Sequence, residues 1–158
     1  MKVAIFFGSK SDIDVMKGAG NALKEFGIPY NAYILSAHRV PEKLIETLEK
    51  IEKEGCEVII AGAGLAAHLP GVIASHTILP IIGVPVRAAV EGMDALLSIV
   101  QMPKGIPVAT VTIDLGLNAA LLALQIMTLK YPKLKEDLKS YREEMAQKVL
   151  EDDKNLRG

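Results

Sequence analysis

The feature that most constrains the fold is a series of short apolar runs separated by segments with helical periodicity. The runs in VAIFF and EVIIA are continuously apolar, which is typical of strands covered on both faces of a parallel sheet. We predict five strands, at Lys2–Phe7, Tyr30–Leu35, Glu57–Ala61, Pro80–Val84 and Val108–Ile113. Strands separated by helices connect through right-handed crossovers, so the predicted sheet is parallel.

Helical patterns fill the segments between the predicted strands. The residues at their ends fit this interpretation, because Asp12 can cap a helix, Pro41 suits a first helical turn and Gly55 can follow a last one. We predict helices at 12–26, 41–54, 69–75, 93–100 and 117–129. Together these signals predict an α/β protein: a three-layer αβα sandwich, flavodoxin-like, with a central parallel sheet of about five strands.

The chain of 158 residues contains no repeat or linker, so we expect one domain over residues 1–158. An extra C-terminal helix is predicted at about 133–153. One face of that helix carries a narrow apolar stripe, formed by Leu134, Leu138, Tyr141, Met145 and Val149. Two alternatives remain open for the stripe, which packs either on its own subunit or on a neighbouring copy of the chain.

Charge and hydropathy limit the classes of partner. Eighteen basic and nineteen acidic side chains give a formal net charge of −1 and are spread along the chain, so no nucleic acid or membrane partner is expected. The apolar run at the N-terminus is too short for a signal peptide, which favours a cytoplasmic location. Cys56 is the single cysteine, and we expect it to be a buried apolar side chain.

Ligands of parallel α/β sheets bind at the carboxyl ends of the strands, where loops lead into helix N-termini. The first such loop contains Gly8, Ser9, Ser11 and Asp12. Its hydroxyls and helix N-terminal amides suit a phosphate, and the carboxylate of Asp12 can accept hydrogen bonds from a sugar. The alternative for this loop is an ordinary capping sequence, and the residues alone do not decide between the two.

The second loop contains Ser36, His38 and Arg39. A guanidinium group can bind phosphate through two parallel hydrogen bonds. An imidazole can donate and accept a proton near neutral pH. The pair therefore indicates a proton carrier beside an anion-binding group.

The third predicted loop is rich in small residues, with Gly62, Ala63, Gly64 and Leu65 followed by His68. Small side chains allow backbone amides to surround a compact group such as a carboxylate or CO2. A tight turn with a structural histidine is the alternative. Further along, Met102 lies in a proline-flanked loop and can contact a planar ligand.

The three histidines lack metal-ligand spacing and no acidic cluster lies near them, so no metal site is expected. In the order in which they occur, the motifs resemble those of the class I N5-carboxyaminoimidazole ribonucleotide mutases of purine biosynthesis. The matching segments are Gly8–Asp12, Ser36–Pro41, Ala61–Gly64, Ala66–Gly71, Ile82–Pro85, Leu97–Pro103 and Asn118–Ala123. Leu65 departs from the family pattern, which usually has a third glycine there.

The resemblance implies a flavodoxin-like subunit of a homo-octamer that needs neither metal nor organic cofactor. It implies transfer of a carboxylate from the exocyclic nitrogen of an aminoimidazole ribonucleotide to ring carbon 4. By likeness to the family, Ser9, Asp12 and Arg39 bind the ribose phosphate, Ser11 and Ser36 add hydrogen bonds, and His38 carries the proton.

Two other functions remain as alternatives. A related class carboxylates the aminoimidazole ribonucleotide directly with CO2, but its third loop lacks the form Ala66–Gly71 that is present here. A phosphate-sensing or nucleotide-sensing binding module would explain the first loop alone. It would not require His38 and His68, because a binding module has no need of a proton carrier.

Overall fold

The centre of the molecule is a parallel sheet of five strands in the order β2-β1-β3-β4-β5. The computed structural model describes residues 2–157, so residues 1 and 158 of the expected domain lie outside the described part. The strands are β1 Val3–Phe7, β2 Tyr30–Ile34, β3 Val58–Gly64, β4 Ile81–Val86 and β5 Ala109–Thr110. This is the flavodoxin-like order, and the predicted fold class is confirmed.

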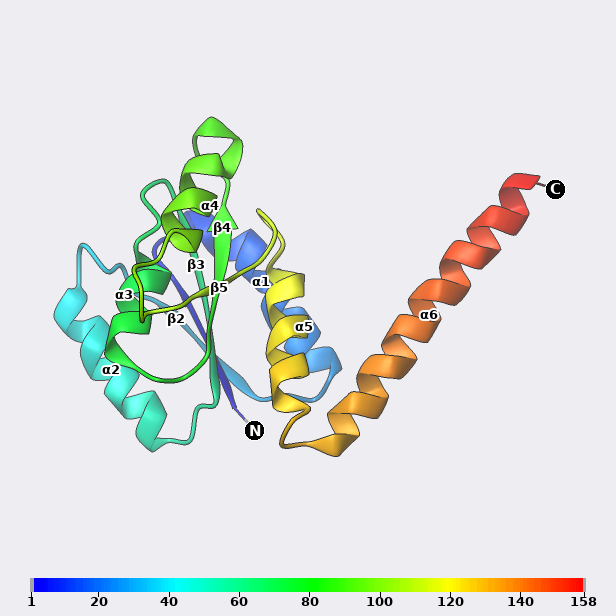
Figure 1. Cartoon of the computed structure of the whole chain (residues 1–158), viewed down its shortest axis with the longest axis horizontal. Helices are drawn as coiled ribbons and strands as arrows, with labels where there is room; N and C mark the ends of the chain where they lie inside the picture. The colour runs from blue at the N-terminus through cyan, green and yellow to red at the C-terminus, as the bar shows by residue number, and fades with distance from the viewer. Residues whose placement is uncertain (1, 158) are drawn as a thin grey trace. The chain divides into compact units, whose positions relative to one another are not determined.

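Helices cover both faces of the sheet (Figure 1). In Figure 1, α1 and α5 lie on one side, and α2, α3 and α4 lie on the other. The helices are α1 Ile13–Glu25, α2 Pro41–Lys53, α3 Leu69–His76, α4 Met93–Val100, α5 Gly116–Met127 and α6 Pro132–Arg157, with short 3-10 turns η1 Lys10–Asp12 and η2 Val90–Gly92. Because the strand order reverses at β1, the crevice outside the carboxyl ends of β1 and β3 is the expected ligand position.

Alternating side chains of the strands supply two apolar layers. On one face, Phe6 and Ile59 are fully buried in a cluster with Leu48 of α2 and Ile73 of α3. On the other face, a β-carbon added to Gly62 would collide with Met16 of α1. The central strands are thus held between two helical layers, which fixes their carboxyl ends in position.

The predicted third strand is too short. β3 continues through Gly62, Ala63 and Gly64, and these residues pair with Val84, Pro85 and Val86 of β4. The expectation that all three belong to a loop is therefore wrong, and the third loop begins at Leu65. The two glycines have different packing reasons: Met16 of α1 lies directly against Gly62, and the carbonyl oxygen of Val86 in β4 lies directly against Gly64.

The predicted fifth strand, in contrast, is too long. Only Ala109 and Thr110 pair with β4. Pro85 has no N–H to donate to the next ladder position, which ends the regular pairing. The chain still follows the sheet edge, because the N–H of Asp114 donates to the carbonyl oxygen of Pro85 at 2.9 Å.

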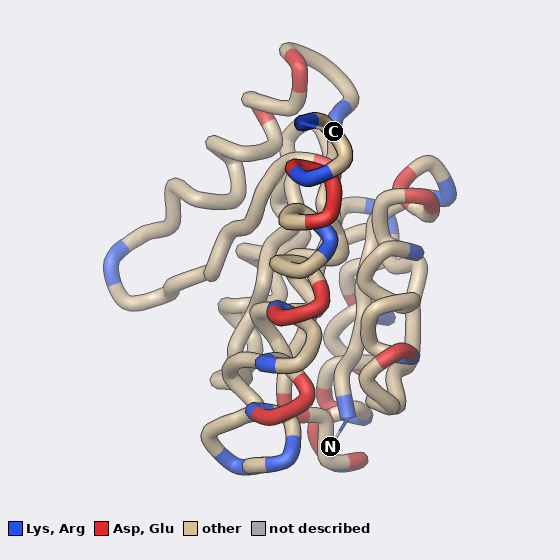
Figure 2. Tube along the Cα trace, turned by 90° about the vertical axis from the view of Figure 1, so that its right-hand side faces the viewer, with Lys and Arg blue, Asp and Glu red and all other residues tan. Residues whose placement is uncertain are grey.

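The chain forms two compact units, one up to Ala123 and one from Leu124 onward. In the second unit, acidic and basic side chains are interspersed along α6 (Figure 2). Leu134 and Leu138 of the apolar stripe are buried, whereas Met145 and Val149 are exposed. The single domain over 1–158 and both alternatives for the stripe stay predictions.

Two further expectations concern single features. Cys56 is 5% exposed and has no disulfide partner, and burial raises the pKa of its thiol. Among residues 2–157, no helix is both long enough and apolar enough to span a membrane.

Candidate active site

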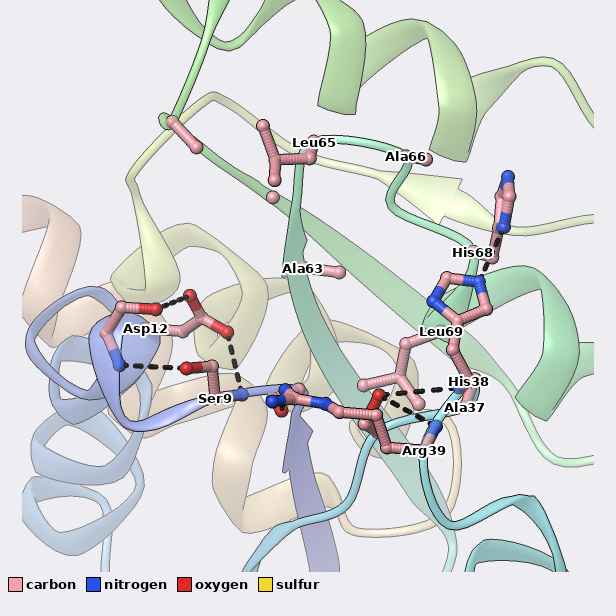
Figure 3. A pocket seen from close by; sticks show the side chains of 15 residues that line it. Ser9, Asp12, Ala37, His38, Arg39, Ala63, Leu65, Ala66, His68 and Leu69 are labelled. Atoms are coloured by element: carbon pink, nitrogen blue, oxygen red, sulfur yellow. Dashed lines mark hydrogen bonds between the residues drawn. The ribbon is translucent and has the colours of Figure 1, made fainter.

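A cavity of about 580 Å³ lies at the carboxyl ends of the strands, where the three predicted loops meet (Figure 3). It is lined by Gly8, Ser9, Ser11, Asp12, Ser36, Ala37, His38, Arg39, Ala63, Gly64, Leu65, Ala66, His68, Leu69 and Ala88. The sheet order explains this meeting, because β1 lies between β2 and β3. We call the side formed by the loops after β1 and β2 the polar wall, and the side formed by residues 63–66 and Ala88 the small-residue wall.

The loop after β1 is fixed by hydrogen bonds of its own. The carboxylate of Asp12 accepts the N–H of Ser9 at 3.1 Å and the hydroxyl of Ser11 at 3.0 Å. Ser9 caps the 3-10 turn, and its hydroxyl oxygen accepts the N–H of Ser11 at 3.4 Å. Asp12 is only 7% exposed and also lines the cavity. Through its two hydrogen bonds, its carboxylate stabilises the loop.

The loop after β2 places a cation beside the first loop. Nη2 of Arg39 donates to the carbonyl oxygen of Gly8 at 2.7 Å. This contact uses one of the five guanidinium donors and holds the side chain across the cavity toward Ser9 (Figure 3). The hydroxyl oxygen of Ser36 accepts the N–H groups of His38 and Arg39, each at 3.3 Å, and so shapes the turn that presents both.

Two histidines meet across the cavity. Nε2 of His38 and Nδ1 of His68 are 2.8 Å apart, and the two rings are nearly perpendicular at 83°. One nitrogen must carry the shared proton and the other must offer a lone pair, so the contact cannot persist when both rings are fully protonated. The pair is exposed at the cavity surface, where it can exchange a proton with a ligand.

The small-residue wall is built by close backbone packing. A β-carbon at Gly64 would lie 2.9 Å from the carbonyl oxygen of Val86 and 3.4 Å from the β-carbon of Ala88. Leu65 follows in a left-handed conformation, with φ 56°. The next turn closes through a 2.8 Å hydrogen bond from the N–H of His68 to the carbonyl oxygen of Ala66.

Most of the predicted site residues meet in this cavity: Ser9, Ser11, Asp12, Ser36, His38, Arg39, Ala63, Gly64, Leu65 and His68. Gly62 and Met102 are not in its described lining. Gly62 packs beneath α1 against Met16, and the sulfur of Met102 approaches Gly71 of α3 instead. Sequence reasoning did not assign Ala88 to the site, because a small apolar side chain carries no chemical signal. Gly8, Ala37, Ala66 and Leu69 lie in the segments that the sequence singled out, although none was assigned a role of its own.

The described residues contain no group of three or more histidine, cysteine, aspartate or glutamate side chains that could hold a metal ion. The fold and the cavity therefore define a flavodoxin-like α/β protein with a small-molecule site at the carboxyl edge of its sheet. The family model described as AIR carboxylase matches residues 2–148. The chain belongs to the AIR carboxylase family.

Known proteins resemble the chain over almost its full length. It is 59% identical over 155 residues to the N5-carboxyaminoimidazole ribonucleotide mutase of Pyrococcus horikoshii, a match that covers 98% of this chain and 88% of that protein. It is 53% identical over 151 residues to the mutase of the same name from Thermotoga maritima, covering 95% and 88%. The crystal structure of Treponema denticola PurE matches with a TM-score of 0.90 at 34% identity, covering 99% of each chain. The family resemblance seen in the sequence is confirmed.

Proposed function

We propose that this chain converts N5-carboxyaminoimidazole ribonucleotide to 4-carboxy-5-aminoimidazole ribonucleotide in purine biosynthesis, and that the described cavity is where it does so. The enzyme is an isomerase of the mutase type, as the curated relatives are named. One observation carries the choice of site. Arg39, the histidine pair and the small-residue wall line a single cavity.

The polar wall binds the ribose phosphate in this proposal. Arg39 supplies a fixed cation, and the hydroxyls of Ser9 and Ser11, which line the same cavity, add hydrogen bonds. Asp12 uses its carboxylate oxygens within the loop and has further lone pairs for a ribose hydroxyl. Ser36 positions the turn that carries Arg39 and His38.

His38 carries the proton. Protonated His38 donates its proton to the exocyclic nitrogen as the nitrogen–carboxylate bond breaks and releases CO2, with the bonding electrons remaining on nitrogen. Ring carbon 4 then attacks CO2 and forms the carbon–carbon bond. Neutral His38 removes the proton from carbon 4 and returns to its initial state. Confinement of CO2 in the cavity makes its recapture a local event.

Every bond, proton and electron pair in this scheme is accounted for by the substrate and His38. We therefore propose that catalysis needs neither a metal nor an organic cofactor. His68 lies 2.8 Å from His38 and can accept or return the shared proton, which orients the His38 ring.

The deciding experiment supplies two substrates separately, in the absence of ATP. One is the carboxyamino ribonucleotide, and the other is the uncarboxylated ribonucleotide with bicarbonate. We expect the first to be converted rapidly to the carbon-carboxylated product and the second only slowly. Faster conversion of the second would identify a direct carboxylase, whereas tight binding with no conversion of either would identify a binding module.

We also propose that the active form is a cytoplasmic homo-octamer. The exposed apolar side chains of Met93, Leu97 and Val100 recur along α4 at spacings of four and three, which forms one uncovered face. Met145 and Val149 add a second exposed apolar surface on α6. Sedimentation equilibrium should give eight times the mass of the chain, and a concentration-independent monomer would contradict the proposal.

A further inference from the structure

Leu65 occupies a backbone conformation that leucine rarely adopts. Its φ of 56° lies in the left-handed region, where most non-glycine residues are unfavourable. Such residues persist when the surrounding structure holds them, and they are concentrated at functional sites. Two questions follow: which contacts hold the backbone of Leu65 in this conformation, and what its side chain does there.

Both ends of the segment are held. Gly64 is paired with Val86 of β4, and even one added carbon at Gly64 would press on the carbonyl oxygen of Val86. After Leu65, the hydrogen bond from His68 to Ala66 closes the turn, and α3 begins at Leu69. The short span between these fixed points sets the backbone of Leu65.

The side chain of Leu65 differs from all its neighbours on the small-residue wall. Ala63, Ala66 and Ala88 contribute one methyl group each, and Gly64 contributes none. Leu65 is 55% exposed at the cavity, on the opposite side from Ser9 and Arg39 (Figure 3). It is thus the one large, exposed apolar side chain in the described cavity lining, since Leu69 is buried.

An apolar side chain at this position suits a ligand such as CO2, which forms only weak hydrogen bonds. CO2 is uncharged and donates no hydrogen bond, so its retention depends on enclosure more than on polar contacts. An apolar cover also excludes water, which would hydrate CO2 to bicarbonate. In this cavity, a side chain larger than a methyl group over an otherwise open wall serves both effects.

We propose that Leu65 is a positioning residue that covers the small-residue end of the cavity and retains CO2 between its release and its recapture. This inference rests on the proposed mutase function. The left-handed backbone directs the isobutyl group over the cavity, and substrate bound at the polar wall completes the enclosure. Loss of the side chain leaves the proton chemistry intact and allows CO2 to escape.

The test follows exchange with dissolved CO2 during turnover. The carboxyamino ribonucleotide is supplied unlabelled in buffer with ¹³C-bicarbonate and carbonic anhydrase, and initial product is analysed by mass spectrometry. Leu65→Ala and Leu65→Gly should each increase the labelled fraction of product, and the release of uncarboxylated ribonucleotide, about three- to tenfold over wild type, because recapture is no longer local. Leu65→Met keeps a long apolar side chain and should remain close to wild type.

Val90 provides a matched control. It is an apolar residue with φ 44° and 72% exposure, outside the described cavity lining, so Val90→Ala makes the same kind of truncation on the same kind of backbone. It should leave the labelled fraction unchanged. A reaction without enzyme corrects for spontaneous loss of CO2 from the substrate.

The outcomes are distinguishable. If wild type converts the substrate and the Leu65 variants incorporate no more label than wild type, the role of Leu65 is refuted and the mutase function stands. If Leu65→Gly leaks but Leu65→Ala does not, backbone freedom and not the side chain controls retention, which also refutes the proposal. If wild type does not convert the substrate at all, the proposed function itself fails.

Discussion

The two walls of the cavity are built by opposite means. On the polar wall, side chains fix the backbone through hydrogen bonds: Nη2 of Arg39 donates to the carbonyl oxygen of Gly8, and the carboxylate of Asp12 accepts the N–H of Ser9. On the small-residue wall, backbones hold one another through close packing, as Gly64 does with Val86. On the polar wall, exchanging one side chain can change the binding of a ligand. On the small-residue wall, the packed backbone tolerates almost no added volume.

The difference corresponds to the two parts of the proposed substrate. A charged phosphate needs directed donors, and CO2 needs an enclosed surface. His38 and His68 join the walls, since one follows β2 and the other precedes α3. Substitutions on each wall, and at their junction, should therefore fail in different ways.

The largest effect is expected at the junction. His38→Asn should reduce kcat by at least about 10²-fold, the usual contribution of a general acid–base residue, while substrate binding survives. Steady-state kinetics together with calorimetric binding of the product separate the two quantities. His76 lies exposed outside the described cavity lining, so His76→Asn should retain wild-type kinetics. Near-normal turnover of His38→Asn would show that His38 is not the proton carrier.

The next largest effect is expected on the polar wall. Arg39→Ala removes a charge-assisted interaction of about 1.5–3 kcal/mol, which corresponds to a KM raised roughly 10- to 100-fold. The change should be greatest for the phosphorylated substrate and small for the nucleoside without phosphate, as competition assays can measure. Arg142→Ala on the exposed surface of α6 is the matched control. Equal losses for both ligands would show that Arg39 does not bind the phosphate.

The two walls also differ in how far the sequence revealed them. His38 and Arg39 were predictable because a proton carrier beside a cation is a specific signal and strand ends gather at one sheet edge. Ser9 and Asp12 also fit a capping sequence, and only the family resemblance assigned them to the ligand. The sequence gives no comparable signal for a small residue such as Ala88, which is placed at the cavity only by the end of β4.

Two structural details needed the fold itself. Gly62, Ala63 and Gly64 have the composition of a loop, yet pairing with β4 makes them strand. The contact of His38 with His68 joins residues thirty positions apart and depends on how two separate loops turn above the sheet. Neither the extent of β3 nor the histidine contact can be predicted from local sequence propensity, because both depend on tertiary packing.

A smaller effect, on stability, tests the packed wall. Gly64→Ala places a β-carbon 2.9 Å from the carbonyl oxygen of Val86 and should lower the free energy of unfolding by about 1–3 kcal/mol, the usual cost of overpacking. Gly8→Ala is the matched control on the polar wall, because its β-carbon would meet no atom closer than Asp12 at 4.0 Å. Urea denaturation measures the free energy of unfolding of both variants. Equal stability of the two variants would show that the walls do not differ in rigidity.

The smallest effect is expected at Ser36, whose hydroxyl contributes to the turn through two long hydrogen bonds. The turn keeps a third bond, from the N–H of Val40 to the carbonyl oxygen of Ser36 at 3.1 Å, so Ser36→Ala should not unfold it. We expect KM to rise about two- to fivefold and kcat to change less, since each lost bond is worth about 1 kcal/mol or less.

Ser75→Ala is the control for Ser36→Ala, because Ser75 is an exposed serine whose hydroxyl bonds locally to the carbonyl oxygen of Val72. It should leave both kinetic constants unchanged. A fall in kcat approaching that of His38→Asn would mean that the Ser36 hydroxyl takes part in proton transfer. The polar wall would then share in the chemistry, and the separation of binding by one wall from CO2 retention by the other would no longer hold.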